Sequence, residues 1–302
     1  MRYQHTIGQT MTCSGIGLHT GESVSLRLEP APPGTGVVFV REVQGRQVLL
    51  QALTHNLVPS ELCTTLRVDG IEVKTVEHVL SALVGLDIDN VYVCVDGAEV
   101  PVMDGSAAPF VRMIQAAGIV PQDQRQAYLK IIQPIELIQG NRRVVIEPSP
   151  VTKVSYSIVY NHPLIQTQRY EYQHSAEAFA SGIAESRTFG FLKEVEGLWA
   201  RGLAKGGSLD NTVVLSETGL MNNSGLRFED EFVRHKVLDL LGDFALLGIP
   251  FIGHVIAERS GHALHTNLVQ QILAQPDKWV LIGGNSHQSI LSHSTSPQLV
   301  SA

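Results

Sequence analysis

The sequence predicts an α+β fold made of two similar domains, each with a mainly antiparallel sheet and a pair of helices. Segments that alternate apolar and polar residues, as half-buried strands do, occupy residues 22–28, 37–43 and 64–75. A second round of such segments occupies 127–138, 142–147 and 152–160. The order helix, Gly, apolar strand, Gly-led loop, helix then occurs twice, over 75–118 and over 228–274. This repeated order indicates an internal duplication.

The length agrees with two domains. A chain of 302 residues is long enough for about two domains of roughly 150 residues. The polar stretch 121–126, PQDQRQ, separates two segments that each have a complete pattern of strands and helices. We therefore expect a linker there, between an N-terminal domain over 1–122 and a C-terminal domain over 127–302.

The first domain begins as antiparallel sheet and continues as helix, strand and helix. Asp69-Gly70 is a strong hairpin turn inside the segment 64–75. Apolar residues at i, i+3, i+4, i+7 and i+8 from Val76 predict a helix that Gly85 ends. Residues 90–95 are an apolar strand, and 106–117 are a helix closed by a glycine.

The second domain repeats this order. Gly140-Asn141 predicts a turn between strands, and Ser175 is the expected cap of a helix that runs to about Ser186. A long helix, a strand and a helix follow, over 228–248, 251–258 and 262–274. From about residue 285 on, the Ser- and Gln-rich composition predicts a loose tail.

The stretch between residues 191 and 209 allows two interpretations. It mixes large apolar side chains with four glycines. An amphipathic core helix followed by a loop would explain the pattern. The wall of an apolar channel would also explain it, because glycines leave space beside the backbone.

Composition and charge exclude several classes of protein. The formal net charge is −7 and no basic run occurs, which argues against nucleic-acid binding. The N-terminus has no apolar signal region, and the most apolar later stretch is short and interrupted by Gly248 and Pro250, so we expect no membrane span. Three cysteines without a CxxC pair fit a reducing cytoplasm and exclude a Cys-only zinc site.

The densest chemical signal is the segment 234–243. His235, Asp239 and Asp243 are spaced i, i+4, i+8 and project from nearly one face of the predicted helix. An imidazole and a carboxylate on such a face can both bind one Zn²⁺. With 12 His and 29 acidic residues, however, about two His–acid pairs at this spacing arise by chance, and most such pairs are solvated. The apolar residues around this group favour burial, and buried charges need partners or a metal.

Glu77-His78 is the second signal. If the halves are duplicated, His78 and His235 lie on corresponding helices and can meet at one point. A metal-binding His beside a Glu that does not bind the metal is typical of a zinc hydrolase, in which the Glu accepts a proton from water. The alternative is a Glu favoured by the helix dipole beside a half-buried His.

Two further segments carry candidate polar groups. His262 follows a Gly-led turn at an expected helix start and could be a general acid or simply a capping or surface residue. Thr188, in Arg187-Thr188-Phe189-Gly190, could donate to an oxyanion or be an ordinary turn residue. The GIGLHTG segment at 15–21 lacks the phosphate-loop pattern and precedes a strand, so it is not a phosphate loop.

Taken together, six segments resemble the UDP-3-O-acyl-N-acetylglucosamine deacetylases of lipid A biosynthesis. They occur in order along nearly the whole chain: SGIGLHTG, TVEHVLSAL, PVMDGSAAPF, RTFGF, GLRFEDEFVRHKVLDLLGD and SGHAL. The resemblance implies a cytoplasmic zinc amidase with two similar α+β domains. It also implies that the helices are sandwiched between the sheets and that the active site lies between the helix layers.

The resemblance also implies roles for individual residues. His78, His235 and Asp239 match the zinc ligands, and Glu77 matches the general base. His262 matches the proton donor to the leaving amine, Asp243 the acid paired with it, Thr188 the oxyanion donor and Lys236 a substrate-contacting cation. The acyl-chain passage of the family falls on the region that contains Leu192, Val195, Ala204, Ser208, Leu209 and Thr212. Phe189 lies in the matching segment RTFGF and is placed with the substrate contacts.

Four other residues are candidate contacts with two interpretations each. Arg142 and His19 could bind the diphosphate, although an Arg in a hairpin turn is usually just solvated. Tyr160 could stack on uracil or simply end a strand. Cys63 could face the metal or be a small buried hydrophobic residue.

The sequence thus predicts zinc-dependent hydrolysis of UDP-3-O-acyl-N-acetylglucosamine to the free 2-amine and acetate. We expect a cytoplasmic monomer that acts on this small-molecule substrate. A zinc hydrolase of another amide is a rival prediction, although the chain has no HExxH motif. A zinc- or acyl-binding protein without turnover is another.

Overall fold

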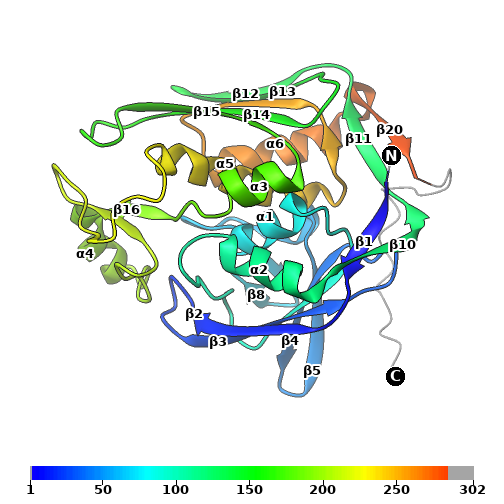
Figure 1. The fold of residues 1–302 in the computed structure, drawn as a ribbon, viewed down its shortest axis with the longest axis horizontal. Coiled ribbons are helices and arrows are strands. Elements are labelled where there is room, and N and C mark those ends of the chain that lie inside the picture. Colours follow the sequence, from blue (N-terminus) through cyan, green and yellow to red (C-terminus); the bar gives the residue numbers. More distant parts are fainter. Residues whose placement is uncertain (1, 285–302) are drawn as a thin grey trace.

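The computed structural model describes residues 2–284 and has the predicted α+β architecture. Two five-stranded sheets lie on opposite sides of the molecule, and a layer of helices lies between them (Figure 1). The helices are α1 (Glu77–Gly85), α2 (Ala108–Ala117), α3 (Ala176–Gly182), α4 (Leu192–Ala200), α5 (Glu231–Phe244) and α6 (His262–Ala274), with 3₁₀ turns η1 (Thr54–Asn56), η2 (Ala245–Leu247) and η3 (Pro276–Lys278). The expected tail from residue 285 lies outside the described residues.

The two large sheets have the same strand order. The first consists, edge to edge, of β2 (Met11–Ile16), β3 (Ser23–Pro30), β9 (Val91–Val95), β4 (Val37–Val43) and β5 (Arg46–Gln51). The second consists of β12 (Ile135–Gln139), β13 (Arg142–Glu147), β19 (His254–Glu258), β14 (Lys153–Val159) and β15 (Thr167–Gln173). In each sheet the central strand is antiparallel to one neighbour and parallel to the other. The two halves therefore repeat one topology, as a duplication would produce.

Four small sheets complete the fold. They pair β1 (Tyr3–Ile7) with β10 (Ile119–Arg125), β11 (Ala127–Ile131) with β18 (Phe251–Ile252) and β20 (Trp279–Gly283), β7 (Thr65–Val68) with β6 (Leu57–Val58) and β8 (Ile71–Val73), and β16 (Phe189–Phe191) with β17 (Val213–Leu215). No helix of residues 2–284 is long and apolar enough to cross a lipid bilayer.

The helix layer is centred on α1 and α5, which pack directly against each other. The contact is close because Gly242 has no side chain: a Cβ there would lie 2.1 Å from the carbonyl oxygen of Glu77. α2 packs beside α1, and α6 packs beside α5. Each half thus contributes a helix pair, and the two central helices bring the halves together.

Several local expectations differ from the structure. Residues 121–126, expected as a linker, lie mostly in β10, which pairs antiparallel with β1 as a two-stranded ribbon. A surface ribbon buries little, so its residues can be polar and escape detection by hydrophobic alternation. The hydrophobic pattern also gave no indication of β15, TQRYEYQ, because this edge strand of the second large sheet buries only Tyr172.

Another difference concerns α4, for which a core helix was one of two interpretations. The core interpretation is wrong, because no residue of α4 is buried and Trp199 is 56% exposed. α4 projects from one end of the molecule beside β16 (Figure 1). The predicted cap of α3 is confirmed, since the Ser175 hydroxyl accepts a hydrogen bond from the Ala178 amide, but α3 ends at Gly182, before the expected residue 186.

Candidate active site

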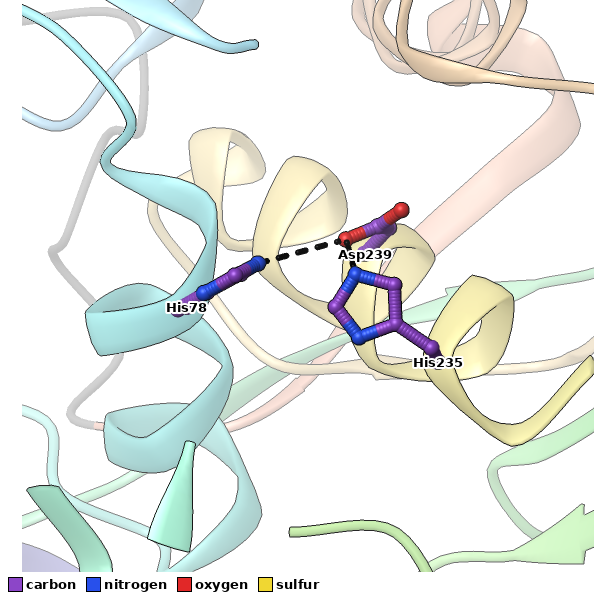
Figure 2. Close-up of side chains that lie close together, drawn as sticks. All are labelled: His78, His235 and Asp239. Carbon is purple, nitrogen blue, oxygen red and sulfur yellow. Dashed lines mark ion pairs between the residues drawn. The ribbon is translucent and has the colours of Figure 1, made fainter. Parts of the chain in front are cut away.

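Three buried side chains from α1 and α5 converge where these helices pack. His78 is the second residue of α1, and His235 and Asp239 lie one turn apart on α5. The Nε2 atoms of His235 and His78 lie 3.3 and 3.7 Å from Oδ1 of Asp239, and Figure 2 shows both rings directed at this oxygen. The two rings meet edge to face, with centroids 5.1 Å apart. We call these three residues the metal cluster.

The protonation of the metal cluster suits a metal ion. Burial lowers the pKa of His78 to about 3 and also lowers the pKa of His235, so both imidazoles are neutral near pH 7. The Nδ1–H of His235 donates to the carbonyl oxygen of Ser186 at 3.1 Å, which leaves Nε2 as the free lone pair. Two imidazole nitrogens and a carboxylate oxygen are a donor set that fits Zn²⁺ and leaves a coordination position for water or substrate.

Lys236 keeps the third member of the metal cluster ionised. Its Nζ donates to Oδ2 of Asp239 at 2.6 Å, whereas His78 and His235 approach the other oxygen, Oδ1. Burial alone would raise the pKa of Asp239, but His235 and Lys236 outweigh it and hold this pKa well below its ordinary value. Asp239 is therefore a carboxylate.

Glu77 lies beside the metal cluster in a dry environment. Its side chain is buried, and burial raises its pKa to about 8. One oxygen, Oε2, accepts the backbone N–H of Thr64 at 3.0 Å, while Oε1 lies 3.8 Å from Nε2 of His262. A carboxyl group whose pKa lies near neutrality can both accept and release a proton.

Asp243 organises a second group of polar side chains. Its Oδ2 accepts hydrogen bonds from Nδ1 of His262 and Nδ1 of His265, both at 2.8 Å, and its Oδ1 accepts the hydroxyl of Thr64 at 2.5 Å. We call Asp243, His262 and His265 the proton cluster. Burial alone would lower the pKa of His262, but Asp243 and Asp239 raise it to about 10, whereas the pKa of the fully buried His265 is lowered. His262 is thus the cationic member, and its Nε2 faces Glu77 and Asp239.

Several candidate substrate contacts surround the metal cluster on the β16 side. The Phe189 ring packs edge-on against Phe232 and His235, at centroid distances of 5.1 and 6.4 Å. Tyr160 packs in turn against Phe189 at 5.9 Å. Thr188 precedes Phe189, and its backbone bonds to Gly105 and Val213. These contacts bring the Thr188–Phe189 segment next to the metal cluster.

The residues expected along the acyl passage lie on α4 and the loop after it. Leu192 and Val195 belong to α4, and Ala204, Ser208, Leu209 and Thr212 follow it. None is buried; Leu192 and Leu209 are each 45% exposed. They form an open apolar region beyond β16 rather than part of the core.

The remaining predicted residues, His19, Arg142 and Cys63, lie in different parts of the molecule. His19 is buried; its Nδ1 accepts the Ala204 amide at 3.4 Å, and its Nε2 is buried without a hydrogen-bond partner in the described part of the chain. The GIGLHTG segment therefore lies against the loop that follows α4. Arg142, by contrast, is exposed at the start of β13 on the outer sheet. The Cys63 thiol is buried between Ser60 Oγ at 3.2 Å and Thr65 Oγ1 at 3.6 Å.

Sequence reasoning missed three residues that hold this site together. His265 could have been found, because it lies at i+3 from His262 and so on the same face of α6. Thr64 bonds to both Glu77 and Asp243, and Ser186 bonds to His235. Both lie outside helices and strands and far along the chain from most of their partners, so no spacing pattern could have indicated them.

Comparison with known proteins gives one consistent answer. The profile of the family described as "LpxC: UDP-3-O-acyl N-acetylglycosamine deacetylase" matches residues 4–274. The chain is 47% identical over 282 residues to the UDP-3-O-acyl-N-acetylglucosamine deacetylase of Syntrophotalea carbinolica, with 93% of this chain and 91% of that protein covered. It is 44% identical to the enzyme of the same name from Myxococcus xanthus, over 92% of this chain and 89% of that protein. It is 45% identical to the enzyme of the same name from Citrifermentans bemidjiense, with 93% of this chain and 92% of that protein covered.

Proposed function

The chain belongs to the LpxC family of UDP-3-O-acyl N-acetylglycosamine deacetylases, and from this premise we propose that it hydrolyses the acetamide of UDP-3-O-acyl-N-acetylglucosamine in lipid A biosynthesis, with Zn²⁺ as cofactor. The products are the free 2-amine and acetate. One observation carries the proposal: Glu77 and His262 lie within reach of three buried ligand atoms on α1 and α5 that suit a divalent metal. Because the relatives are covered over about nine-tenths of their length, their named activity can be considered for the whole chain.

His78, His235 and Asp239 would hold the Zn²⁺. When bound there, the metal would polarise the acetamide carbonyl and make a water molecule more acidic. Asp239 contributes the negative charge, and the Lys236 ammonium donates a hydrogen bond to Oδ2, the Asp239 oxygen that His78 and His235 do not approach. Lys236 would also contact the substrate, because its Nζ lies beside the site.

Glu77 would accept the proton of the attacking water. Its Oε2 is occupied by the Thr64 amide, so Oε1 is the oxygen that receives the proton. The buried position raises the pKa of Glu77 to about 8, which makes the carboxylate a stronger base than an exposed Glu. The Thr188 hydroxyl would donate a hydrogen bond to the oxygen that becomes negatively charged during attack.

His262 would donate a proton to the departing amine from Nε2. Its Nδ1 is held by Asp243, so Nε2 is the nitrogen that faces Glu77 and the reacting group. The anionic Asp243 keeps His262 in the protonated form before the transfer. The two groups would thus transfer protons in opposite directions: Glu77 accepts one in its carboxylate form, and His262 gives one in its cationic form.

The surrounding residues would bind the rest of the substrate. The acyl chain would lie along Phe189 and the apolar region of Leu192, Val195, Ala204, Ser208, Leu209 and Thr212. The buried Nε2 of His19, which has no partner among residues 2–284, supports a contact to a polar group such as the diphosphate. The contacts of Arg142 to the diphosphate and of Tyr160 to uracil stay proposals. We further propose that the enzyme acts as a cytoplasmic monomer whose domains span 1–122 and 127–302.

The test is acetate release from UDP-3-O-acyl-N-acetylglucosamine, measured after chelation and again after stoichiometric Zn²⁺ is restored. Activity that is lost and regained supports both reaction and cofactor. Glu77→Gln is the matched variant, because it should abolish turnover while zinc and substrate still bind. A zinc-loaded protein without activity would instead favour a binding protein or another amide substrate, whereas full activity in Glu77→Gln would show that Glu77 is not the general base.

A further inference from the structure

The short segment 186–189 contacts the metal cluster at both of its ends. The carbonyl oxygen of Ser186 accepts the Nδ1–H of His235 at 3.1 Å, and the Phe189 ring packs edge-on against the His235 ring. Thr188, our proposed donor to the oxyanion, lies between these two residues in the chain. Such a donor must be held to within about 0.5 Å of its productive position. The groups that fix the backbone of this segment therefore matter for the proposed reaction.

Glu231 holds the segment from the first turn of α5. It is the first residue of this helix and is fully buried. Its Oε1 accepts the backbone N–H of Arg187 at 2.9 Å and the Nε–H of the same residue at 2.8 Å. Its Oε2 accepts the Nη2–H of Arg187 at 3.0 Å and the backbone N–H of Arg227 at 2.7 Å. One carboxylate thus binds both the backbone and the side chain of the residue that precedes Thr188.

The same helix carries a member of the metal cluster. Glu231 and His235 lie four residues apart on α5, and residues at this spacing share a helix face. The backbone of Thr188 is also fixed: its N–H donates to the Gly105 carbonyl, and its own carbonyl accepts the N–H of Val213, both at 2.8 Å. The position of Thr188 relative to His235 therefore depends on the carboxylate that ties its neighbour to α5.

Stability alone is a poor explanation for the pair of Arg187 and Glu231. Their side chains are 5% and 0% exposed, so both charges are removed from water. The cost of that desolvation can exceed the attraction between the charges, and apolar side chains of similar volume often give equal or greater stability. What a buried Arg–carboxylate pair does provide is a fixed geometry, because the planar guanidinium fork bonds in defined directions. The pair therefore fits a positional role better than a stabilising one.

We propose that Glu231 is a positioning residue for the deacetylation: through Arg187 it fixes the Thr188 hydroxyl relative to His235. The proposal rests on the function proposed above, because it takes Thr188 as the donor to the oxyanion. Glu231 acts only through the backbone of the following partners and does not contact the acetamide. Its loss therefore weakens an interaction made in the transition state, so kcat falls while KM changes little.

The first test is a double-mutant cycle on the full chain loaded with Zn²⁺. Glu231→Gln keeps the shape of the side chain but turns an amide NH₂ group toward N–H donors of Arg187 or Arg227, which cannot accept it. We expect kcat to fall by about 10- to 100-fold with zinc retained, less than the roughly 10²- to 10³-fold cost of losing an oxyanion donor. In a Thr188→Ala background the same change should lower kcat by less than about threefold, because the two residues act as a unit. Equal losses in both backgrounds, or a normal kcat in Thr188→Ala, would overturn the proposal.

A second measurement does not need turnover. The methyl NMR signal of Thr188 should shift in Glu231→Gln and stay in place in Asp230→Asn, the matched control. Asp230 directly precedes Glu231, and within the described part of the chain its carboxylate bonds only to Arg234, at 2.5 Å. The control should also keep its kcat.

Arg187→Lys serves where Glu231→Gln does not fold. It keeps the charge and the backbone bond to Glu231 but replaces the planar fork with a point charge, so the Thr188 signal should shift less and kcat should fall less. A Thr188 signal that is unmoved in the folded variants would refute the positioning role, whether or not the wild-type protein is a deacetylase. A shifted signal in a chain that releases no acetate would support the positioning of Thr188 and count against the proposed function alone.

Discussion

The metal cluster and the proton cluster contain the same residue types and differ in geometry and charge. Each has two His and one Asp whose ligand atoms lie within 4.8 Å of one another. In the proton cluster the Asp243 oxygen lies 2.8 Å from each imidazole nitrogen, which is hydrogen-bond distance, so protons already occupy the space between them. In the metal cluster the corresponding distances are 3.3 and 3.7 Å. The two clusters therefore do not differ in residue composition, but they differ in the distance between the Asp oxygen and the imidazole nitrogens.

Burial and partners explain the difference. In the metal cluster both imidazole pKa values are lowered, and Lys236 neutralises Asp239 from the outer side. Among residues 2–284 no Lys or Arg forms an ion pair with Asp243, and His262 is the cation that balances it. The metal cluster thus offers two neutral imidazoles beside a carboxylate, whereas the proton cluster contains a cationic imidazole.

The largest effect should come from breaking the metal cluster. Asp239→Ala or His235→Ala removes a donor atom, and we expect zinc affinity to fall by more than the roughly 10- to 100-fold that loss of an outer partner costs. Turnover should fall with it. Zinc content after dialysis measures this directly. Full zinc occupancy in both variants would show that the ligands lie elsewhere.

Breaking the proton cluster should have a different signature. Asp243→Asn keeps the shape of the side chain but removes the charge that holds His262 protonated. We expect zinc to be retained and kcat to fall by about 10²- to 10⁴-fold, the usual value of a general acid. His262→Ala should behave in the same way. If zinc were lost from either variant, the two clusters would not be independent.

The sequence predicts more of the fold than of the candidate site. Hydrophobic alternation located most strands of the two large sheets, and helical periodicity located α1, α5 and α6, because these elements each bury one face. β10 and α4 bury almost nothing, so their patterns carried no comparable information. The composition of a segment and the period of its apolar residues indicate which residues are buried. They therefore do not predict elements that bury few residues.

Within the site, the spacing of His235 and Asp239 and the position of Glu77-His78 could be read from helix geometry. The roles assigned to these residues came from the family resemblance and stay predictions. Thr64 could not be found by spacing, because it reaches Asp243 from 179 positions away in the chain. Contacts of that kind exist only after folding, when α5 meets the loop before β7.

Thr64 offers a smaller perturbation, with a neighbouring control. Thr64→Val removes the hydroxyl that donates to Asp243 and leaves a buried carboxylate oxygen unsatisfied. We expect a stability loss of about 1–3 kcal/mol in denaturant unfolding and a decrease in kcat with zinc retained. Thr65→Val is the control, because Thr65 is equally buried but within residues 2–284 its hydroxyl bonds only to the Cys63 thiol, at 3.6 Å. Equal losses of kcat in the two variants would remove Thr64 from the proton cluster.

Ser260 should give the smallest effect. Its hydroxyl lies 2.8 Å from Nε2 of His265 and 2.8 Å from the Tyr156 hydroxyl, one step further from Asp243. In Ser260→Ala the Tyr156 hydroxyl, 3.1 Å from the same Nε2, still lies within reach of His265, so the imidazole keeps a partner. We therefore expect a loss of only about 0.5–1.5 kcal/mol in stability and little change in kcat. A kcat as low as that of Asp243→Asn would instead show that the proton cluster extends through His265 to Ser260, and that its boundary lies deeper between α6 and β14 than the direct contacts of Asp243.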